Sequence, residues 1–323
     1  MRIVVFDGPL FTSGDVSWAA LERLGGVRVV GTAGKEDIPI RAADAEAVFT
    51  LCTPLNREAI RAMPALRYIG VIDAFGLPRV NVAAAHKRGI AVCRVAVDAA
   101  TPLAEHAFAL MMELAREVGR HAHAVARGRW RKEGRAGWWL SPLRRLAGRT
   151  VGLVGWAPLG PAVAARAAAF GMPMLAHSPD GAPVSHPGVE RVSLDVLLAR
   201  SDVVLVHLAD GAGPVLDADR LTRMKPGSWL IQTGPYAAVD EAALVAALVG
   251  GAPAAAALDG LAIEPPPPDH PLLGRPNCLI TPRHGWAALE TRQEFIEAAA
   301  ANLEAFLAGR PVNVLAPAAG DHG

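Results

Sequence analysis

Short runs of apolar, often β-branched residues alternate with alanine-rich segments along most of the chain. The runs have the length and composition of buried strands in a parallel sheet, and they are Ile3–Phe6, Ala47–Leu51, Tyr68–Ile72, Val151–Val154, Met174–Ala176, Val203–His207, Trp229–Gln232 and Cys278–Ile280. The segments between them have the composition of helices, as in Ser17–Leu24, Arg57–Met63, Pro161–Phe170, Leu194–Ala199, Asp240–Val249 and Thr291–Leu307. This order of strand, helix and strand predicts an α/β fold with doubly wound parallel sheets.

The pattern of strands and helices stops near Val95 and begins again at Val151. Between these positions we expect a long helix over Thr101–Val125 and then a basic arm, 127–149, that contains Trp130, Trp138 and Trp139. The restart predicts two similar α/β domains. The arm either packs on its own domain or contacts a second subunit, and we favour the second because exposed tryptophans mark interfaces.

The composition is that of a globular protein, since 52% of the 323 residues are hydrophobic and 20% are charged. It excludes an intrinsically disordered chain. The formal net charge of +1 gives no electrostatic reason to expect nucleic acid or an acidic membrane as a partner. Glycine and proline interrupt the apolar stretch Ala242–Leu258, and the start of the chain is charged, so we expect neither a membrane span nor a signal peptide. The distant cysteines Cys52, Cys93 and Cys278 predict no disulfide framework and a cytoplasmic location.

A glycine-containing turn follows Val151–Val154 at the position of a dinucleotide-binding motif. Its residues, all candidates for contact with a cofactor, are Gly155, Trp156, Ala157, Pro158, Leu159 and Gly160. Ala157 replaces the glycine that lets a backbone approach pyrophosphate, and Pro158 removes an N–H group. Ser178 stands where an acidic residue would bind the adenosine ribose, and Asp180 follows it closely. The motif predicts weak or absent binding of NAD or NADP, and a turn that binds nothing remains an alternative.

Longer stretches of the chain identify a family. They are Ala83–Ile90, Ala104–His106, Leu146–Gly155, Ala169–Met172, Ser201–Val204, Met224–Gly227, Val239–Leu244, Ala257–Asp259, Asp269–Leu273 and Gly309–Asn313. On these stretches the chain resembles the D-2-hydroxyacid dehydrogenase family, especially its glyoxylate/hydroxypyruvate reductase-like members, over nearly its whole length. The resemblance implies a substrate domain, 1–98 with 285–323, and an inserted Rossmann domain, 99–284, with a dimerisation helix and arm at 101–149. It also implies a nicotinamide cofactor, a small-molecule ligand and a homodimer.

The chemistry of that family uses an arginine that binds the substrate, a histidine that donates a proton, and a glutamate that raises the pKa of this histidine. Pro235 stands at the position expected for the arginine, with Tyr236 beside it, and Arg283 stands at the position expected for the histidine. His284 comes one residue late, and Glu264 stands where the family has its glutamate. The candidate catalytic residues are therefore Glu264, Arg283, His284 and Tyr236. We also expect an ion pair between Arg283 and Glu264, which either closes the cleft or anchors an anionic ligand.

Two loops that face ligands in the family also depart from its pattern. The segment after His207 is shorter than in the family, and the loop 73–81 is longer and lacks a glycine pair. By resemblance, His207, Thr233 and Asp259 join the candidate cofactor-binding residues. Changes concentrated at ligand-facing positions favour an altered function over random decay.

Three functions therefore remain open. The first is a nicotinamide-dependent oxidoreductase that is not an ordinary 2-oxo acid reductase. The second is a repurposed enzyme, redox or not, for an aromatic or apolar anionic ligand, because Trp156, Tyr236 and Trp286 map to loops around the cleft. The third is a catalytically silent, dimeric binding protein.

No metal site is expected from the sequence. His121 and His123 are two positions apart on a predicted helix and do not share a face. His106 also belongs to a predicted helix, and we interpret it as structural.

Overall fold

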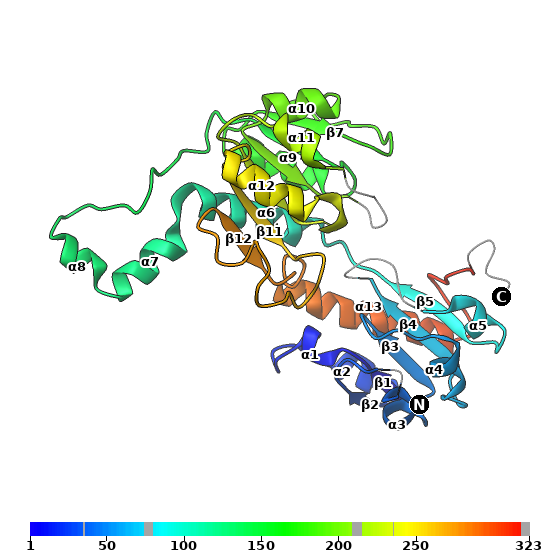
Figure 1. The fold of residues 1–323 in the computed structure, drawn as a ribbon. Helices are drawn as coiled ribbons and strands as arrows, with labels where there is room; N and C mark the ends of the chain where they lie inside the picture. The colour runs from blue at the N-terminus through cyan, green and yellow to red at the C-terminus, as the bar shows by residue number, and fades with distance from the viewer. Residues whose placement is uncertain (35, 74–79, 209–214, 235, 318–323) are drawn as a thin grey trace. The chain divides into compact units, whose positions relative to one another are not determined.

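The computed structural model describes residues 1–34, 36–73, 80–208, 215–234 and 236–317. The chain divides into two compact units (Figure 1). Unit 1 consists of Met1–Ala99 and Ala287–Gly323, and unit 2 consists of Ala100–Trp286. Unit 2 is thus inserted into unit 1, and the boundaries expected from the sequence were at residues 98 and 285.

Unit 1 is built on a parallel sheet in the order β2–β1–β3–β4–β5. The strands are β1 (Arg2–Val5), β2 (Gly26–Val29), β3 (Ala47–Thr50), β4 (Tyr68–Ile72) and β5 (Ala91–Val95). The helices are α1 (Gly8–Phe11), α2 (Ala19–Glu22), α3 (Ile38–Ala42), α4 (Arg57–Arg61), α5 (Val82–His86) and α13 (Leu289–Leu307). Every residue of β3 and β4 is buried, as expected for central strands of a parallel sheet.

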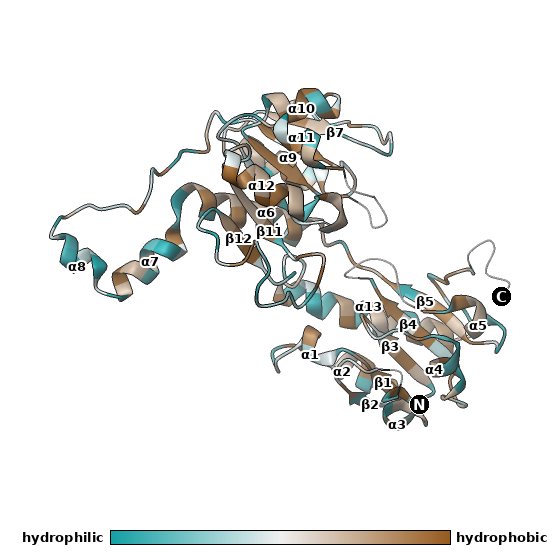
Figure 2. Cartoon of the chain, in the orientation of Figure 1, coloured by the Kyte–Doolittle hydropathy of each residue, from teal (hydrophilic) through white to brown (hydrophobic). Residues whose placement is uncertain are grey.

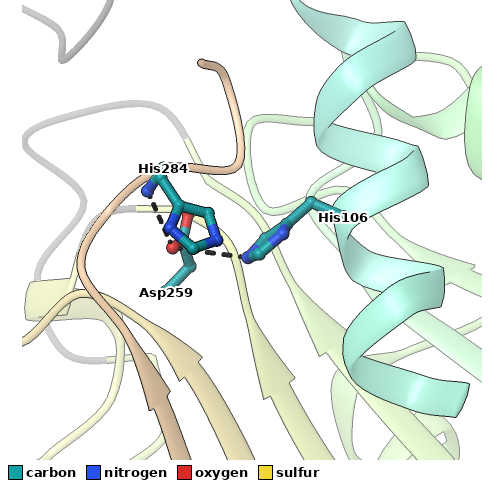
Figure 3. Close-up of side chains that lie close together, drawn as sticks. All are labelled: His106, Asp259 and His284. Atoms are coloured by element: carbon teal, nitrogen blue, oxygen red, sulfur yellow. Dashed lines mark hydrogen bonds and ion pairs between the residues drawn. The ribbon is translucent and has the colours of Figure 1, made fainter. Parts of the chain in front are cut away.

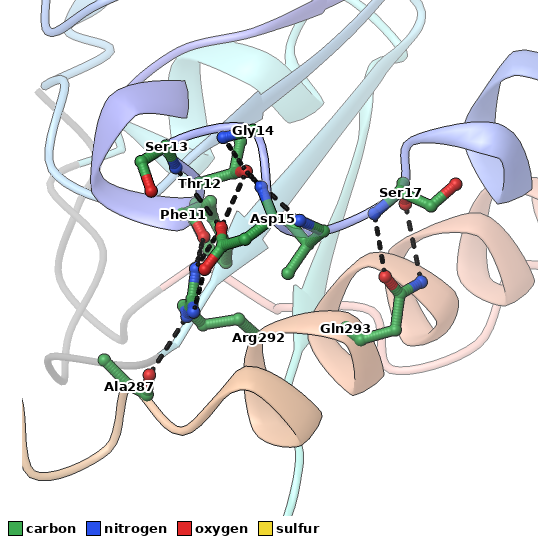
Figure 4. A network of polar contacts seen from close by, with 10 residues as sticks. Phe11, Thr12, Ser13, Gly14, Asp15, Ser17, Ala287, Arg292 and Gln293 are labelled. Atoms are coloured by element: carbon green, nitrogen blue, oxygen red, sulfur yellow. Dashed lines mark hydrogen bonds and ion pairs between the residues drawn. The ribbon is translucent and has the colours of Figure 1, made fainter.

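A polar network ties the first turn of α13 to the N-terminal segment of unit 1 (Figure 4). The Arg292 guanidinium donates to both carboxylate oxygens of Asp15, at 2.9 and 2.7 Å, and to the Phe11 carbonyl oxygen at 2.6 Å. The Gln293 side-chain oxygen accepts the Ser17 N–H at 2.9 Å. The hydrogen bonds from Arg292 hold the pKa of Asp15 well below its usual range. This network joins the two chain segments that make up unit 1.

Unit 2 contains a parallel sheet in the order β12–β11–β10–β9–β6–β7–β8. The strands are β6 (Val151–Val154), β7 (Met174–His177), β8 (Val189–Arg191), β9 (Val203–Val206), β10 (Trp229–Gln232), β11 (Ala255–Asp259) and β12 (Cys278–Thr281). β6 lies between β7 and β9, so the strand order reverses beside it. In doubly wound sheets, ligands bind outside the carboxyl ends of the strands at such a reversal. The predicted fold class, two doubly wound parallel sheets with one domain inserted into the other, is confirmed.

Helices cover both faces of the sheet of unit 2. They are α6 (Ala100–Arg116) and α9 (Gly160–Ala169) on one face and α10 (Leu194–Arg200), α11 (Ala218–Thr222) and α12 (Glu241–Gly250) on the other. Unit 2 also contains α7 (Val118–Ala126) and α8 (Arg129–Glu133), which bury no residue, and the short 3₁₀ helix η1 (Tyr236–Ala238). Leu153 and Leu205 pack with residues of α6 and α9, whereas Val204 and Val206 pack with residues of α10, α11 and α12. Figure 2 shows the strands of this sheet as mostly hydrophobic and α8 as largely hydrophilic. Within the described residues, no helix combines the length and the apolar character that a membrane span requires.

The single helix expected over Thr101–Val125 is wrong in one respect, because it is interrupted. α6 and α7 meet at Glu117, whose φ is 47°, in the left-handed region. The Glu113 carboxylate accepts the N–H of Gly119 at 3.2 and 3.1 Å, and Ser141 Oγ donates to Glu117 at 2.7 Å. At the break, these side-chain hydrogen bonds replace the backbone hydrogen bonds of a continuous helix. The pattern of apolar residues in the sequence does not reveal them.

Four strands were missed in the sequence pattern: β2, β5, β8 and β11. β2 and β8 are edge strands that are largely exposed, so they lack an apolar run. β11 reads Ala-Ala-Ala-Leu-Asp, and alanine has a low preference for strands. β11 ends at Asp259, one of the residues expected to bind a cofactor.

Candidate active site at the carboxyl ends of β11 and β12

β11 and β12 end side by side, with Asp259 paired in register with Thr281. Thr281 Oγ1 donates a hydrogen bond to Asp259 Oδ1 at 2.7 Å. After β12 the chain turns over this carboxylate, and the N–H groups of His284 and Gly285 donate to it at 3.0 and 2.8 Å. A Cβ added at Gly285 would lie 2.8 Å from Asp259 Oδ2, so the close turn requires glycine. Asp259 therefore fixes the segment that carries Arg283 and His284.

His106 of α6 reaches the same carboxylate. Its Nε2 atom lies 3.3 Å from Asp259 Oδ1 and 3.2 Å from Thr281 Oγ1. The rings of His106 and His284 meet edge to face, with centroids 4.9 Å apart and planes at 74° (Figure 3). Asp259 is buried, His106 is half-buried and His284 is exposed. The fold thus assembles two imidazoles and one carboxylate from three separate elements of unit 2.

The surroundings of Asp259 favour its ionised form. Burial raises the pKa of this carboxyl, but the hydrogen bonds from His106, Thr281 and Gly285 outweigh burial, and the pKa lies below its usual range. The result is a buried negative charge whose ionic partner is His106, a residue that is charged only when protonated. Asp259, expected as a cofactor-binding residue, here binds side chains and backbone of its own unit.

The predicted ion pair between Arg283 and Glu264 is confirmed, with Arg283 Nε 3.4 Å from Glu264 Oε2. The N–H of Leu261 donates to Glu264 Oε1 at 3.2 Å and holds this carboxylate in place. Arg283 has a φ of 51°, in the left-handed region, and its carbonyl oxygen accepts the Trp286 indole N–H at 3.1 Å. Both members of the pair are partly exposed. An anionic ligand can therefore approach the pair from solvent.

The indole rings expected around the cleft are packing residues instead. Trp156 and Trp286 have exposed fractions of only 6% and 4%. The Trp156 ring packs so closely on Gly160 that a Cβ added there would lie 2.4 Å from it. The aromatic cleft proposed from Trp156, Tyr236 and Trp286 is therefore not built by the two tryptophans. Pro235, the side chain of Tyr236, and residues 74–79 and 209–214 of the two divergent loops lie outside the described residues.

The turn after β6 keeps both glycines for steric reasons. Gly155 has a φ of 95°, and a Cβ added there would lie 1.8 Å from the His207 carbonyl oxygen. The N–H of Gly160 is bound to the Trp156 carbonyl oxygen at 2.6 Å, and Pro158 carries no N–H. These two positions therefore offer no donor to a phosphate at this end of α9.

The other residues of this turn decide how a dinucleotide would fit. Ala157 is exposed and Leu159 is buried. The edge of the sheet thus suits a dinucleotide at the reversal of strand order, but with few phosphate donors and a methyl group at the position of the second glycine. We conclude that the residues fit a nicotinamide dinucleotide.

Asp180 presents a carboxylate two residues after Ser178, the position at which the sequence predicts the ribose contact. Ser178 Oγ donates to Asp180 Oδ1 at 2.5 Å, and the Ala182 N–H donates to the same oxygen at 3.1 Å. The bond from Ser178 and that from Ala182 hold the pKa of Asp180 below its usual range. Asp180 is exposed, so its carboxylate is available to accept hydrogen bonds from a ribose diol.

His207 and Thr233 directly follow β9 and β10. His207 Nδ1 lies 3.4 Å from Thr233 Oγ1. Burial lowers the pKa of His207 and outweighs the hydrogen bond to Thr233, so its imidazole is neutral at neutral pH. A neutral, enclosed histidine fits a packing role better than proton donation.

The residue missed in the sequence is His106. It was interpreted as structural, and its partners Asp259 and His284 were assigned to a cofactor site and to catalysis separately. The positions that flank it, Ala104 and Ala107, are buried, so a histidine near the inward face of a helix was the available signal. A half-buried polar side chain near that face needs a hydrogen-bond partner.

Comparisons with known proteins agree with this architecture. Residues 108–285 match the family model described as D-isomer specific 2-hydroxyacid dehydrogenase, NAD binding domain. A hydroxypyruvate reductase from Blautia hydrogenotrophica is 35% identical over 98% of this chain and 99% of its own. A solved Thermus thermophilus protein is 33% identical over 98% of this chain and 100% of its own, with a TM-score of 0.83. An NADPH-dependent glyoxylate/hydroxypyruvate reductase from Sinorhizobium meliloti, solved with citrate, is 29% identical over 98% of each chain, with a TM-score of 0.81. The chain belongs to the D-isomer specific 2-hydroxyacid dehydrogenase family.

Proposed function

We propose that the protein is a nicotinamide-dependent oxidoreductase that binds an anionic substrate through Arg283 and is not an ordinary 2-oxo acid reductase. The observation that carries this proposal is the ion pair of Arg283 with Glu264, 3.4 Å apart. In the family pattern a histidine would stand at Arg283 and donate a proton. A guanidinium can hold an anion but does not act as an acid–base group at neutral pH.

In this proposal Arg283 binds the anionic ligand and Glu264 positions Arg283. The guanidinium presents a planar fork of donors that matches a carboxylate, a phosphate or a related anion. Glu264, held by the Leu261 N–H, keeps the guanidinium in place. When an anionic ligand binds, the arginine can keep one N–H on Glu264 and direct others to the ligand.

His284 is the proposed proton donor. Its imidazole is exposed, and its backbone is fixed by the hydrogen bond to Asp259 at 3.0 Å. A histidine exchanges protons near neutral pH, which a general acid for a carbonyl oxygen requires. Tyr236 is a second candidate, although an unperturbed phenol, with a pKa of about 10, is a weaker acid than histidine.

The proposed cofactor is NAD or NADP, bound weakly. When bound, the nicotinamide supplies or accepts the hydride. The residues Gly155 to Gly160 offer few phosphate donors, while Asp180 offers a carboxylate to the ribose. Asp180 would repel the 2′-phosphate of NADP, so NAD is favoured.

The arm of unit 2 supports a homodimer. α7 and α8 bury no residue, and Trp130 and Trp139 are 45% and 65% exposed. Tryptophans of this kind mark an interface, and we propose that the segment 101–149 joins two copies of the chain. Cys52, Cys93 and Cys278 are free thiols, which suits the proposed cytoplasmic location. Sedimentation of wild type and of Trp139→Ser tests the dimer.

The decisive experiment is a substrate screen with NADH and NADPH. Glyoxylate, hydroxypyruvate and pyruvate are expected to give no detectable turnover, whereas a panel of larger anionic carbonyl compounds is expected to contain a substrate. Arg283→Gln should raise the KM for that substrate, and His284→Ala should lower kcat by about 10²–10⁴-fold. Turnover of the three small acids in the usual range of about 1–10³ per second would overturn the proposal.

A further inference from the structure

We propose that His106, Asp259 and His284 form a binding site for one divalent transition-metal ion, with Zn²⁺ as the best fit. Their ligand atoms all lie within 4.8 Å of one another. Among the described residues, this is the one group of three or more histidine, cysteine or acidic side chains assembled in this way. The site shares His284 with the proposed oxidoreductase activity, but metal binding by these three side chains does not depend on that activity.

The spacing of the ligand atoms suits a tetrahedral ion. Zn²⁺ binds imidazole nitrogen and carboxylate oxygen at about 2.0–2.2 Å, which places two such atoms about 3.3–3.4 Å apart. His106 Nε2 and Asp259 Oδ1 are 3.3 Å apart. A charge-assisted hydrogen bond between the same groups would be shorter, at about 2.7–2.9 Å. The distance is therefore longer than that of an optimised ion pair and fits shared coordination of one ion, which would replace the hydrogen bond that His106 donates to Asp259 in the metal-free protein.

The charge of Asp259 supplies a reason for a cation to bind. The carboxylate is 4% exposed, and its ionic partner among the described residues is the half-buried His106. A buried carboxylate is stable when it is paired or coordinates a metal. Neutral histidines with an ionised carboxylate are the form in which these side chains ligate Zn²⁺.

The neighbours of Asp259 act as an outer shell. Thr281 Oγ1 and the Gly285 N–H donate to its oxygens at 2.7 and 2.8 Å and fix the orientation of the carboxylate. Such hydrogen bonds typically orient metal ligands. His284 is exposed on a turn, so its ring can rotate to close the site, and its edge-to-face contact with His106 already brings the two imidazoles together (Figure 3).

Three protein ligands leave the fourth position of a tetrahedron for water or for an anionic ligand. Zn²⁺ bound here would engage the imidazole of His284. The metal would therefore inhibit any reaction in which His284 donates a proton, and metal removal would restore that reaction.

The test uses the untagged, chelator-treated full-length protein and Zn²⁺ alone. Titration calorimetry should give one equivalent of bound Zn²⁺ per chain, and Co²⁺ should give the visible absorption of a tetrahedral site. His284→Ala should weaken Zn²⁺ binding at least about 100-fold while the fold is kept, because the backbone bond to Asp259 remains. His123→Ala removes an exposed histidine outside the site and should bind as wild type does.

His106→Ala and Asp259→Asn should also lose the site, with circular dichroism to establish that each variant is folded. Equal Zn²⁺ affinity in His284→Ala and wild type would overturn the proposal, as would wild-type protein that binds no Zn²⁺ at micromolar concentration. Neither result depends on an enzyme assay. A missing substrate would count against the proposed oxidoreductase and leave the metal result standing.

Discussion

Asp7 in unit 1 and Asp259 in unit 2 occupy the same kind of position and use it differently. Each stands at the carboxyl end of a parallel strand and accepts N–H groups from the segment that follows the neighbouring strand. Asp7 accepts the N–H groups of Leu51, Cys52 and Thr53 at 3.0, 2.7 and 2.8 Å. Asp259 accepts those of His284 and Gly285. Both carboxylates thus fix a turn at the edge of a sheet.

The two carboxylates differ in their other hydrogen-bond partners. Asp7 also accepts the Thr53 hydroxyl at 2.7 Å and is fully buried. Asp259 adds the imidazole of His106, with the exposed His284 ring beside it. The Asp7 carboxylate is enclosed by backbone N–H groups and by the hydroxyls of Thr50 and Thr53, and it holds a loop in place. A carboxylate that also binds imidazoles can hold a cation or position a proton donor, and unit 2 is where we place the chemistry.

The largest effect is expected from Asp7→Asn. This change removes the charge and turns an NH₂ group toward the Thr53 hydroxyl, while one oxygen remains for the three N–H donors, so it should lower the free energy of unfolding of unit 1 by about 3 kcal/mol. Urea denaturation followed by hydrogen exchange in β1 and β3 measures the loss. Asp44→Asn, an exposed member of a surface ion pair, is the matched control and should cost much less stability, because solvent screens the pair. Equal losses would show that the enclosed carboxylate adds nothing special.

The next largest effect is the pH dependence of the difference in unfolding free energy between wild type and Asp7→Asn. Burial raises the pKa of Asp7, but the hydrogen bonds from Cys52 and Thr53 outweigh it, so the folded pKa lies below its usual value. A depressed carboxyl pKa gives stability that is complete above the unfolded pKa of about 3.9 and is lost as pH falls through the folded value. The gap in unfolding free energy between wild type and Asp7→Asn should therefore narrow below about pH 4. A gap that stays constant down to pH 2.5 would contradict this.

Asp259→Asn should cost less stability than Asp7→Asn, about 2 kcal/mol, because Asp259 accepts two backbone N–H groups where Asp7 accepts three. It should still lose the function assigned to unit 2 under conditions where it is folded. Hydrogen exchange in β11 and β12 gives the stability, and a Zn²⁺ titration of the folded variant gives the function. Full Zn²⁺ binding by Asp259→Asn would remove the distinction drawn between the two aspartates.

The Arg283 and Glu264 pair should give a smaller effect. Arg283→Ala leaves a partly exposed carboxylate without its partner, so it should destabilise more than the double change Arg283→Ala with Glu264→Gln, by about 1 kcal/mol or less. Calorimetric melting of the two variants measures the difference. Identical melting temperatures would mean that the ion pair contributes nothing to stability, and its role would then rest on ligand binding alone.

The fold was accessible from the sequence because parallel strands buried on both faces leave apolar runs, as in β3, β6 and β9. Arg283 and Glu264 were accessible through the family resemblance, because both lie in short motifs that can be aligned with the family's pattern. His106 was not, since it meets Thr281 across 175 positions of sequence and no local pattern encodes that contact. The break at Glu117 was hidden for a related reason, because side-chain hydrogen bonds produce it.

The effect expected at the phosphate turn separates binding from folding. Ala157 is exposed and is not among the residues with positive φ, so Ala157→Gly relieves no strain and should lower stability by about 0.5–1 kcal/mol through chain entropy. The same change removes the methyl group that crowds a pyrophosphate, and NADH should bind up to about tenfold more tightly, a gain of about 1.4 kcal/mol. Calorimetric titration with NADH measures the affinity, with Ala136→Gly, at an exposed alanine of the arm, as the control. Opposite signs for stability and affinity identify the methyl group as a local obstacle. Sub-micromolar NADH binding by the wild type would show that Ala157 and Pro158 do not limit the cofactor.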